Sequence, residues 1–392
     1  MLYDYEECQK IFDSFNSELI KEVEPIGYTE IEKLPIRCFK LGNGKNNIVV
    51  SASQHANEVI STTFIIYLMN YLKNNHIIFE DLSIYFIPIL NPEGYIINTS
   101  AIRSKIARNE NTDKFIKYCC EYFKNYQYDR ENNFSEKLHQ KMFEDVDYKI
   151  LDKKYVILKD STGEILKNHP KGSIIDWASN GNGVDLNSNS IYKKVSEYEF
   201  NRSNAYNNIR VDIPSPIGYP GETNSLTFEQ ELEIKSLKKL FEKLNNEGKI
   251  IGYLNYHSAG GVIFQRPEDN NNLFSIAYNY LLSKYYQEHT IKNDRKYGIV
   301  EKSSGKVISV NDTFRVTYSG NLLIELSAFL GNPIGVFKER DNFKNTIESN
   351  IKSFIYTMEN ITKIYGISKE LVSKIEDVNL IYPVVDDYYK NR

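Results

Sequence analysis

Apolar positions along the chain follow two different periods, and their alternation predicts an α/β fold. Residues 58–75, "EVISTTFIIYLMNYLKNN", have the length and period of a helix. Residues 81–90, "DLSIYFIPIL", are almost continuously apolar, which is typical of a strand buried on both faces. Two later runs, "IIGYLNYHS" and "NLLIELS", predict further buried strands. Strands that alternate with helices indicate a largely parallel sheet.

The two ends of the chain extend this pattern. Apolar residues from Tyr5 to Ile20 recur at near-helical spacing and predict an opening helix. The runs "LPIRCFKLG" and "NIVVSAS" flank the turn "NGKN" and predict a hairpin. Two more helices are expected, one from about 228 to 245 started by a capping box of Thr227 and Gln230, and one near 340–364.

The region 109–175 breaks the pattern because it is rich in charged and aromatic residues. It contains two helix-like stretches, 112–126 and 134–144, and a predicted hairpin, "YVILKDSTGEILK". The α/β pattern resumes at "GVDLNSN". We therefore expect one catalytic domain over 1–392, with 109–175 as an inserted α+β subdomain or lid.

Composition excludes some classes of protein. The chain has 48 Lys and Arg against 52 Asp and Glu, a formal net charge of −4, so it lacks the basic surface that nucleic-acid binding requires. The N-terminus "MLYDYEECQK" has no apolar core, and the run "FIIYLMNYL" is about half a membrane span. Four cysteines, two of them adjacent, suit reduced thiols. These features predict a cytoplasmic protein without a membrane anchor, and they leave its oligomeric state open.

Two of the six histidines, His55 and His257, lie where apolar strand-like runs end. Ligands of open α/β sheets gather beyond the carboxyl ends of strands, so these two side chains are expected to converge. Glu58 joins them if the loop curls back into the next helix. Two imidazoles, one carboxylate and one open position make a catalytic zinc site. Each residue taken alone also fits a structural role, as a capping residue or a hydrogen-bonded core histidine.

Glu325 supplies a second carboxylate, in the apolar strand "NLLIELS". A carboxylate in a dry strand is costly unless it has a partner or a chemical role, so a buried salt bridge and catalysis both remain open for it.

Together these segments resemble the zinc carboxypeptidase family, the funnelins. The resemblance lies in five signals in the family's order: "SQHANE", "IPILNPEGY", "GVDLNSN", "YLNYHSAGG" and "LLIELS". It implies helices around a mixed, mostly parallel eight-stranded sheet and one Zn²⁺ per chain held by His55, Glu58 and His257. It also implies that Glu325 is the general base.

The main departure from the family is at Asn187-Ser188, where relatives usually have Asn-Arg. Serine cannot make the bidentate contact by which that arginine grips a substrate's terminal carboxylate. The segment "DWASNGNGVDLN" is instead similar to the bacterial branch that cleaves γ-D-glutamyl-diamino-acid peptides. Asn187 and Ser188 are therefore predicted to contact substrate, and ordinary C-terminal trimming is not expected.

Other assignments that the resemblance implies are looser. Arg108, with Arg103 second, is the predicted oxyanion-stabilising arginine, and Asp312 lies near the family's pocket acid. Tyr297 is displaced from the tyrosine that closes over substrate in digestive members, so it receives no catalytic role. The candidate cations that replace the missing arginine are Lys171, Arg266 and Arg315.

Three functions remain in view from the sequence. The leading one is a cytoplasmic zinc metallopeptidase that acts on small peptides, some of them derived from cell wall. The second is a zinc-dependent deacylase of N-acyl amino acids, and the third is an inactive binding protein of the same fold. The segment "NPEGY" and the chain length favour the peptidase.

Overall fold

The structure is a computed structural model, and it describes residues 3–104, 177–189, 219, 221, 230–265, 272–292, 294–300, 318–328 and 340–392. The helices in these parts are α1 (Tyr5–Asp13), α2 (Val59–Asn74), α3 (Pro92–Ser104), α9 (Leu232–Glu247), α10 (Leu273–Gln287), α12 (Arg340–Val372), the 3₁₀ turn η4 (Val378–Leu380) and α13 (Ile381–Lys390). The strands are β1 (Ile20–Tyr28), β2 (Pro35–Leu41), β3 (Asn46–Ala52), β4 (Leu82–Ile87), β5 (Lys249–Ala259), β6 (Val262–Phe264), β7 (Gly298–Val300) and β8 (Asn321–Ser327).

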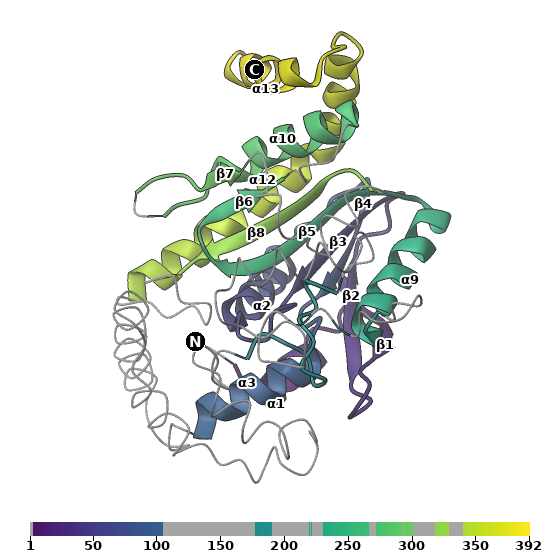
Figure 1. Cartoon of the computed structure of the whole chain (residues 1–392), viewed down its shortest axis with the longest axis vertical. Coiled ribbons are helices and arrows are strands. Elements are labelled where there is room, and N and C mark those ends of the chain that lie inside the picture. The colour runs from purple at the N-terminus through teal and green to yellow at the C-terminus, as the bar shows by residue number, and fades with distance from the viewer. Residues whose placement is uncertain are drawn as a thin grey trace.

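The strands form one eight-stranded sheet in the order β1-β2-β4-β3-β5-β8-β6-β7 (Figure 1). Its four central strands, β4, β3, β5 and β8, are mutually parallel, whereas β2 and β6 run antiparallel to their inner neighbours. The central strands are nearly continuously apolar and buried, as strands covered on both faces must be. The predicted mixed, mostly parallel sheet is confirmed.

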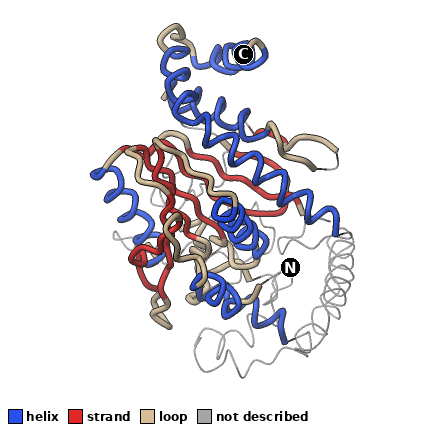
Figure 2. The backbone as a smooth tube through the Cα atoms, turned by 180° about the vertical axis from the view of Figure 1, so that it is seen from behind, coloured by secondary structure: helices blue, strands red, loops and turns tan. Residues whose placement is uncertain are grey.

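Helices cover both faces of this sheet (Figures 1 and 2). Side chains alternate along β3: Ile48 and Val50 join the apolar cluster formed with α2, α10 and α12. Val49, between them, joins the cluster formed with α9 on the opposite face. Alternate side chains of β3 thus pack into two separate apolar layers, one on each face of the sheet.

Three sequence-based expectations differ from the structure near the N-terminus and at α9. The predicted hairpin of β2 and β3 is wrong because β4 lies between them, and β2 pairs instead with β1 and β4. The opening helix ends at Asp13, since Ile20 already begins β1. Helix α9 begins at Leu232 with Glu231 as its N-cap, so Gln230 lies before the helix and the expected capping box does not start it.

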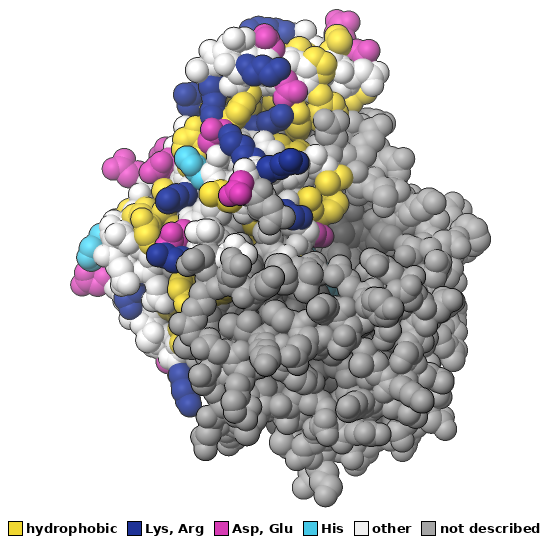
Figure 3. All heavy atoms as spheres, turned by 90° about the vertical axis from the view of Figure 1, so that its left-hand side faces the viewer, with side chains coloured by type: hydrophobic (Ala, Val, Ile, Leu, Met, Phe, Trp, Pro, Cys, Tyr) yellow, Lys and Arg dark blue, Asp and Glu magenta, His cyan; other side chains and the backbone are white. Residues whose placement is uncertain are grey.

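The C-terminal helices reach beyond the sheet. Helix α12 is longer than the predicted 340–364, and α13 lies at the far end of the molecule, where Asp386 pairs with Lys284 of α10 at 2.8 Å (Figure 1). On the face drawn in Figure 3, Lys and Arg side chains of this end lie among acidic ones. No helix in the described ranges combines the length and apolarity needed to cross a membrane. The predicted insertion, 109–175, lies outside the described residues.

The chain changes direction across the sheet at β3. It passes from β3 to β4 on one side and later returns to β5 on the other side. This reversal is a topological switch point, and in open α/β sheets the crevice beyond the strand ends at such a point is where ligands bind. The loop after β3 and the carboxyl end of β5 therefore frame the place where a site is expected.

Candidate active site

The loop that follows β3 carries two of the predicted ligands. The chain turns sharply at Ser53, with φ +46°, and the Ser53 hydroxyl lies 2.7 Å from that of Thr62 in α2. Glu58 is the N-cap residue of α2, but its side chain makes no capping hydrogen bond. It turns instead toward His55, whose Nδ1 lies 3.0 Å from Glu58 Oε1.

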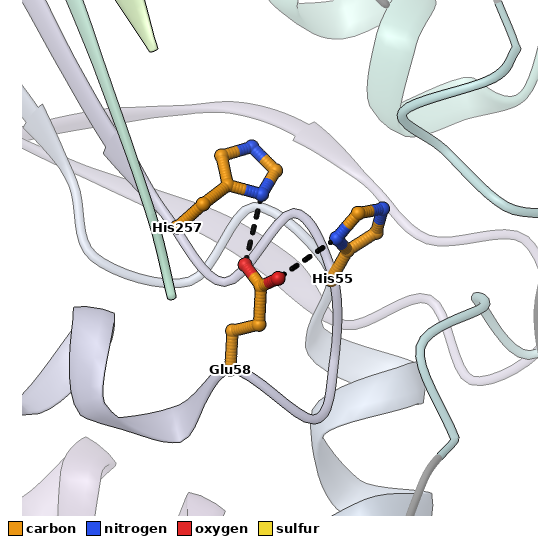
Figure 4. A group of neighbouring side chains, drawn as sticks. All are labelled: His55, Glu58 and His257. Atoms are coloured by element: carbon orange, nitrogen blue, oxygen red, sulfur yellow. Dashed lines mark hydrogen bonds and ion pairs between the residues drawn. The ribbon is translucent and has the colours of Figure 1, made fainter. Parts of the chain in front are cut away.

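His257 reaches the same place from β5. It lies two residues before the end of that strand, and its side chain is almost fully buried. Its Nδ1 is 2.8 Å from Oε2 of Glu58, so the one carboxylate faces both imidazoles (Figure 4). The two rings meet edge to face with centroids 4.9 Å apart. Residues far apart in the sequence thus converge as predicted.

Charge in this cluster is strongly perturbed. Burial alone would raise the pKa of Glu58, but the nearby His257 and His55 outweigh it and lower that pKa to about 2. Burial would likewise lower the pKa of His55, yet the carboxylates of Glu58 and Asp185 raise it well above its usual value. The cluster therefore favours an ionised Glu58 carboxylate and a positive charge close to His55.

This donor set fits a zinc ion. One ligand atom from each of His55, Glu58 and His257 lies within 4.8 Å of the other two, which lets a single ion contact all three. Two imidazole nitrogens and one carboxylate oxygen are a ligand set of catalytic zinc sites, which leave a fourth position open. The second nitrogen of His55 lies 3.3 Å from Asp185, the carboxylate contact that commonly orients a zinc-bound imidazole.

The remaining carboxylate, Glu325, lies beside the triad on β8. It is the register partner of His257 in the adjacent parallel strand. Its Oε2 accepts a hydrogen bond of 3.0 Å from the N–H of Gly260, in the turn after β5. Burial, reinforced by the negative charge of Glu58, raises the pKa of Glu325 to about 7. A carboxyl with such a pKa is suited to both accept and release a proton near neutral pH.

A zinc carboxypeptidase family model matches residues 16–318, well over half of the chain. The chain belongs to the zinc carboxypeptidase family. With the triad described above, this makes it a zinc metallopeptidase with one Zn²⁺ held by His55, Glu58 and His257.

Solved structures share the fold at low sequence identity. Bovine thrombin-activatable fibrinolysis inhibitor, in complex with tick carboxypeptidase inhibitor, is 14% identical with a TM-score of 0.55, covering 93% of this chain and 98% of that one. A metallo-carboxypeptidase from Burkholderia cenocepacia is 9% identical with a TM-score of 0.51, covering 92% and 70%. A search of curated proteins found no significant match. These likenesses agree with the zinc carboxypeptidase fold.

The family's N-P-E-G segment has a structural part in this chain. Asn91 donates through Nδ2 to the backbone oxygens of Gln54 and Ser179, at 3.2 and 3.1 Å, and its Oδ1 accepts from the N–H of Gly94. A Cβ on Gly94 would lie 2.2 Å from the Ser179 oxygen, so a side chain does not fit there. Asn91 thus ties the ligand loop to residues 177–189.

Half-buried Glu231 and buried Glu233 lie on the other side of the 177–189 loop. The Asn180 amide donates to Glu231 Oε2 at 2.8 Å, and Asn182 donates to the same oxygen at 2.9 Å. Glu233, in the first turn of α9, is 1% exposed, and its Oε2 has no hydrogen-bond partner in the described part of the chain. Burial and the neighbouring Glu231 raise the pKa of Glu233 to about 8.

The predicted substrate residues Asn187 and Ser188 follow Asp185 in this loop. The N–H of Asn187 donates to Asp185 Oδ1 at 3.0 Å, and the N–H of Ser188 to the Asp185 carbonyl at 2.9 Å. Ser188 is 1% exposed, and within the ranges that the structure describes neither its Oγ nor Asn187 Oδ1 has a hydrogen-bond partner. Because Asp185 contacts His55, the loop brings these two polar atoms to the neighbourhood of the zinc ligands.

Five predicted residues lie outside the described residues: Arg108, Asp312, Lys171, Arg266 and Arg315. Arg103 belongs to α3, but its side chain is not described. Tyr297 is buried in the core, where its hydroxyl accepts from Asn350 at 3.0 Å and from the N–H of Ser327 at 2.8 Å.

Sequence reasoning missed the residues that contact the candidate ligands and Glu325. The segment "GVDLNSN" contains Asp185. Zinc-bound histidines commonly donate to a carboxylate, so this acid could have been predicted to contact one of the two histidines. Asn255 lies at the same side of β5 as His257, two residues earlier, which period-two reasoning could have found. Gly260 contributes only a backbone N–H, and side-chain chemistry gives no signal for that.

Proposed function

We propose that the chain hydrolyses amide bonds in small peptides that carry a second charged group, such as γ-D-glutamyl-diamino-acid peptides. The single observation that carries the substrate class is Ser188, buried in the loop that contacts His55. In relatives with Asn-Arg at this place an arginine grips the terminal carboxylate. A serine offers a single uncharged hydroxyl there, which suits a substrate whose charged groups are bound by other residues.

Zinc bound by the triad would supply Lewis acidity, which lowers the pKa of a bound water and polarises the scissile carbonyl. The chain's own contribution to the proton transfers is Glu325. We assign it as the general base that takes a proton from the attacking water. Its pKa of about 7 then allows the same carboxyl to deliver that proton to the leaving amine. Arg108 remains the predicted stabiliser of the developing oxyanion, and Asp312 the predicted pocket acid.

Gly260 and Asp185 support these groups. The hydrogen bond from Gly260 fixes one oxygen of Glu325, which leaves its other oxygen to face the reacting water. Asp185 holds the outer nitrogen of His55 and so keeps the inner nitrogen directed at the metal position. Hydrolysis in the cytoplasm is a further part of the proposal that rests on the sequence alone.

The proposal is tested by comparing kcat/KM of the zinc-loaded protein on three substrates: a hippuryl amino acid, γ-D-glutamyl-diaminopimelate and an N-acetyl amino acid. Glu325→Gln serves as the control for contaminating peptidases. We expect the γ-D-glutamyl peptide to be hydrolysed fastest. A strong preference for the hippuryl substrate would refute the substrate class, and a preference for the N-acetyl amino acid would identify a deacylase.

A further inference from the structure

We propose that Asn255, supported by Ser51 and Gln54, fixes the tautomer and ring orientation of the zinc ligand His257. The proposal rests on His257 being a zinc ligand and assigns a positioning role to a residue of this chain. Asn255 and His257 are two residues apart in β5, so their side chains project from the same face of the strand. Asn255 Nδ2 lies 3.0 Å from Nε2 of His257.

The contacts of His257 place its proton on Nδ1. An amide N–H2 can only donate, so His257 Nε2 accepts from Asn255. In a neutral ring the proton then lies on the opposite nitrogen, Nδ1, which is 2.8 Å from a carboxylate oxygen of Glu58. Binding zinc through Nδ1 requires the lone pair on that atom and therefore moves the proton to Nε2. The group facing Nε2 must then change from donor to acceptor.

The Asn255 amide can make that change without moving its backbone. Its oxygen and nitrogen are nearly equal in size, so a half turn about the terminal torsion places Oδ1 where Nδ2 lies. Ser51, its register partner in β3, lies 2.9 Å from Asn255 Oδ1 and 2.9 Å from the Tyr253 hydroxyl. Because a hydroxyl both donates and accepts, Ser51 serves either orientation.

Gln54 can follow the turn of Asn255. Its Oε1 lies 2.5 Å from Asn255 Nδ2, while its own Nε2 is buried and has no hydrogen-bond partner among the described residues. If both amides turn, Gln54 Nε2 donates to Asn255 Oδ1, and Gln54 Oε1 takes the place where Nε2 now lies. The contact between the two amides is therefore kept in either arrangement. The side chains of residues 51, 54 and 255 thus form a network that can match the tautomer that zinc needs.

The expected consequence is an effect on zinc affinity. Residues that orient a zinc-bound histidine typically contribute about 10- to 100-fold in metal affinity. Asn255→Leu keeps the size of the side chain but has no acceptor for the Nε2 proton. Asn255→Asp offers an acceptor oxygen in either orientation. We expect the zinc Kd of Asn255→Leu to rise by about 10- to 100-fold and that of Asn255→Asp to stay within a few-fold of wild type.

The control for general loss of stability is Asn279→Leu. Asn279 is also a buried asparagine, and its Oδ1 accepts from the backbone of Gly320 and Asn321 at 2.7 and 3.1 Å. This variant should lower the melting temperature without changing the zinc Kd. If Asn279→Leu weakens zinc binding as much as Asn255→Leu does, the effect is general destabilisation and the proposal fails.

Zinc affinity is measured on the full chain by competition with a chromophoric chelator. The tautomer is read by NMR of zinc-loaded protein labelled with ¹⁵N-histidine. We expect a protonated Nε2 on His257 in the wild type, protected from solvent exchange, and loss of that protection in Asn255→Leu. An unchanged zinc Kd in Asn255→Leu, or an unprotonated Nε2 in the wild type, overturns the proposal. Neither readout uses hydrolysis, so a failure of the proposed peptidase activity would be seen separately.

Discussion

The backbone N–H of Gly260 holds Oε2 of Glu325 at 3.0 Å, in a space that admits no side chain. A Cβ on Gly260 would lie 2.1 Å from that same oxygen and 3.0 Å from Cγ2 of Val262. The proposed general base is therefore positioned by a backbone group on the strand end that also carries His257.

Gly260→Ala should displace the Glu325 carboxylate and lower kcat by about 10- to 100-fold, a part of what a general base usually supplies. Zinc content should stay at one per chain because the three ligands are untouched. The matched control is Gly298→Ala, where the nearest atom, Val262 Cγ1, is at an ordinary 3.4 Å. Equal kcat in the two variants would show that Glu325 does not depend on this close approach.

Glu325→Gln should lower kcat by about 10²- to 10⁴-fold or more, since the amide cannot accept the proton from water. Zinc content should not change. The melting temperature should not fall, because the substitution removes a carboxyl whose ionised form is disfavoured by burial. Activity, bound metal and thermal unfolding are measured on the same preparation, and retained turnover would place the base on another residue.

His257→Ala should lose both zinc and activity, because two ligands are left for the ion. Metal analysis after dialysis against dilute chelator measures the loss. His289→Ala, at an exposed position, is the control and should keep its zinc. Full zinc occupancy in the His257 variant would contradict the ligand assignment.

Ser188→Arg should shift specificity toward the hippuryl substrate. A charge-assisted bidentate contact to a carboxylate contributes about 1.5–3 kcal/mol per hydrogen bond, so its absence costs at least about a hundredfold in kcat/KM. The ratio of kcat/KM for the hippuryl and γ-D-glutamyl substrates is measured, since partial unfolding cancels in it. Ser188→Lys supplies the charge without the fork and should shift the ratio less. A ratio unchanged by arginine would show that residue 188 does not contact the carboxylate.

Glu233 should make the protein less stable as the pH rises. Its folded pKa of about 8 lies above its unfolded value, so the folded state binds more protons between about pH 4.5 and 8. The free energy of unfolding should fall by about 1.4 kcal/mol per pH unit within that window. Urea unfolding of zinc-saturated protein at pH 5 and pH 8 should show a steeper fall in wild type than in Glu233→Gln, which keeps the contribution of other raised carboxyls such as Glu325. Glu242→Gln, an exposed position on the same helix, should behave as wild type, and equal slopes in all three proteins would exclude Glu233 as the source.

The central sheet and the zinc ligands could be predicted because both leave local signals. A buried parallel strand is a continuous apolar run, and a histidine where such a run ends stands out, as His55 and His257 do. The pairing of β2 could not be predicted. The turn "NGKN" is a strong local hairpin signal, whereas insertion of β4 between β2 and β3 depends on burial over the whole sheet.

The supporting residues of the site were harder to predict for a related reason. Asn255, Gln54 and Ser51 are ordinary polar residues in strands or loops, and their joint contact appears only when β3 and β5 pair in register. The same holds for Gly260, whose N–H has meaning only beside Glu325. Spacing in the sequence reveals ligands, whereas the contacts that orient them depend on the fold.

The order of strands in the sheet also decides when the site comes into being during synthesis. His55 and Glu58 are made early, next to β3, but their partner on β5 follows only after α9. Glu325 follows later still, on β8, which pairs with the other edge of β5. Such pairing between strands far apart in the sequence forms slowly. A nascent chain that ends before β8 therefore lacks the proposed base even when all three metal ligands have been made, so it is not expected to hydrolyse peptides.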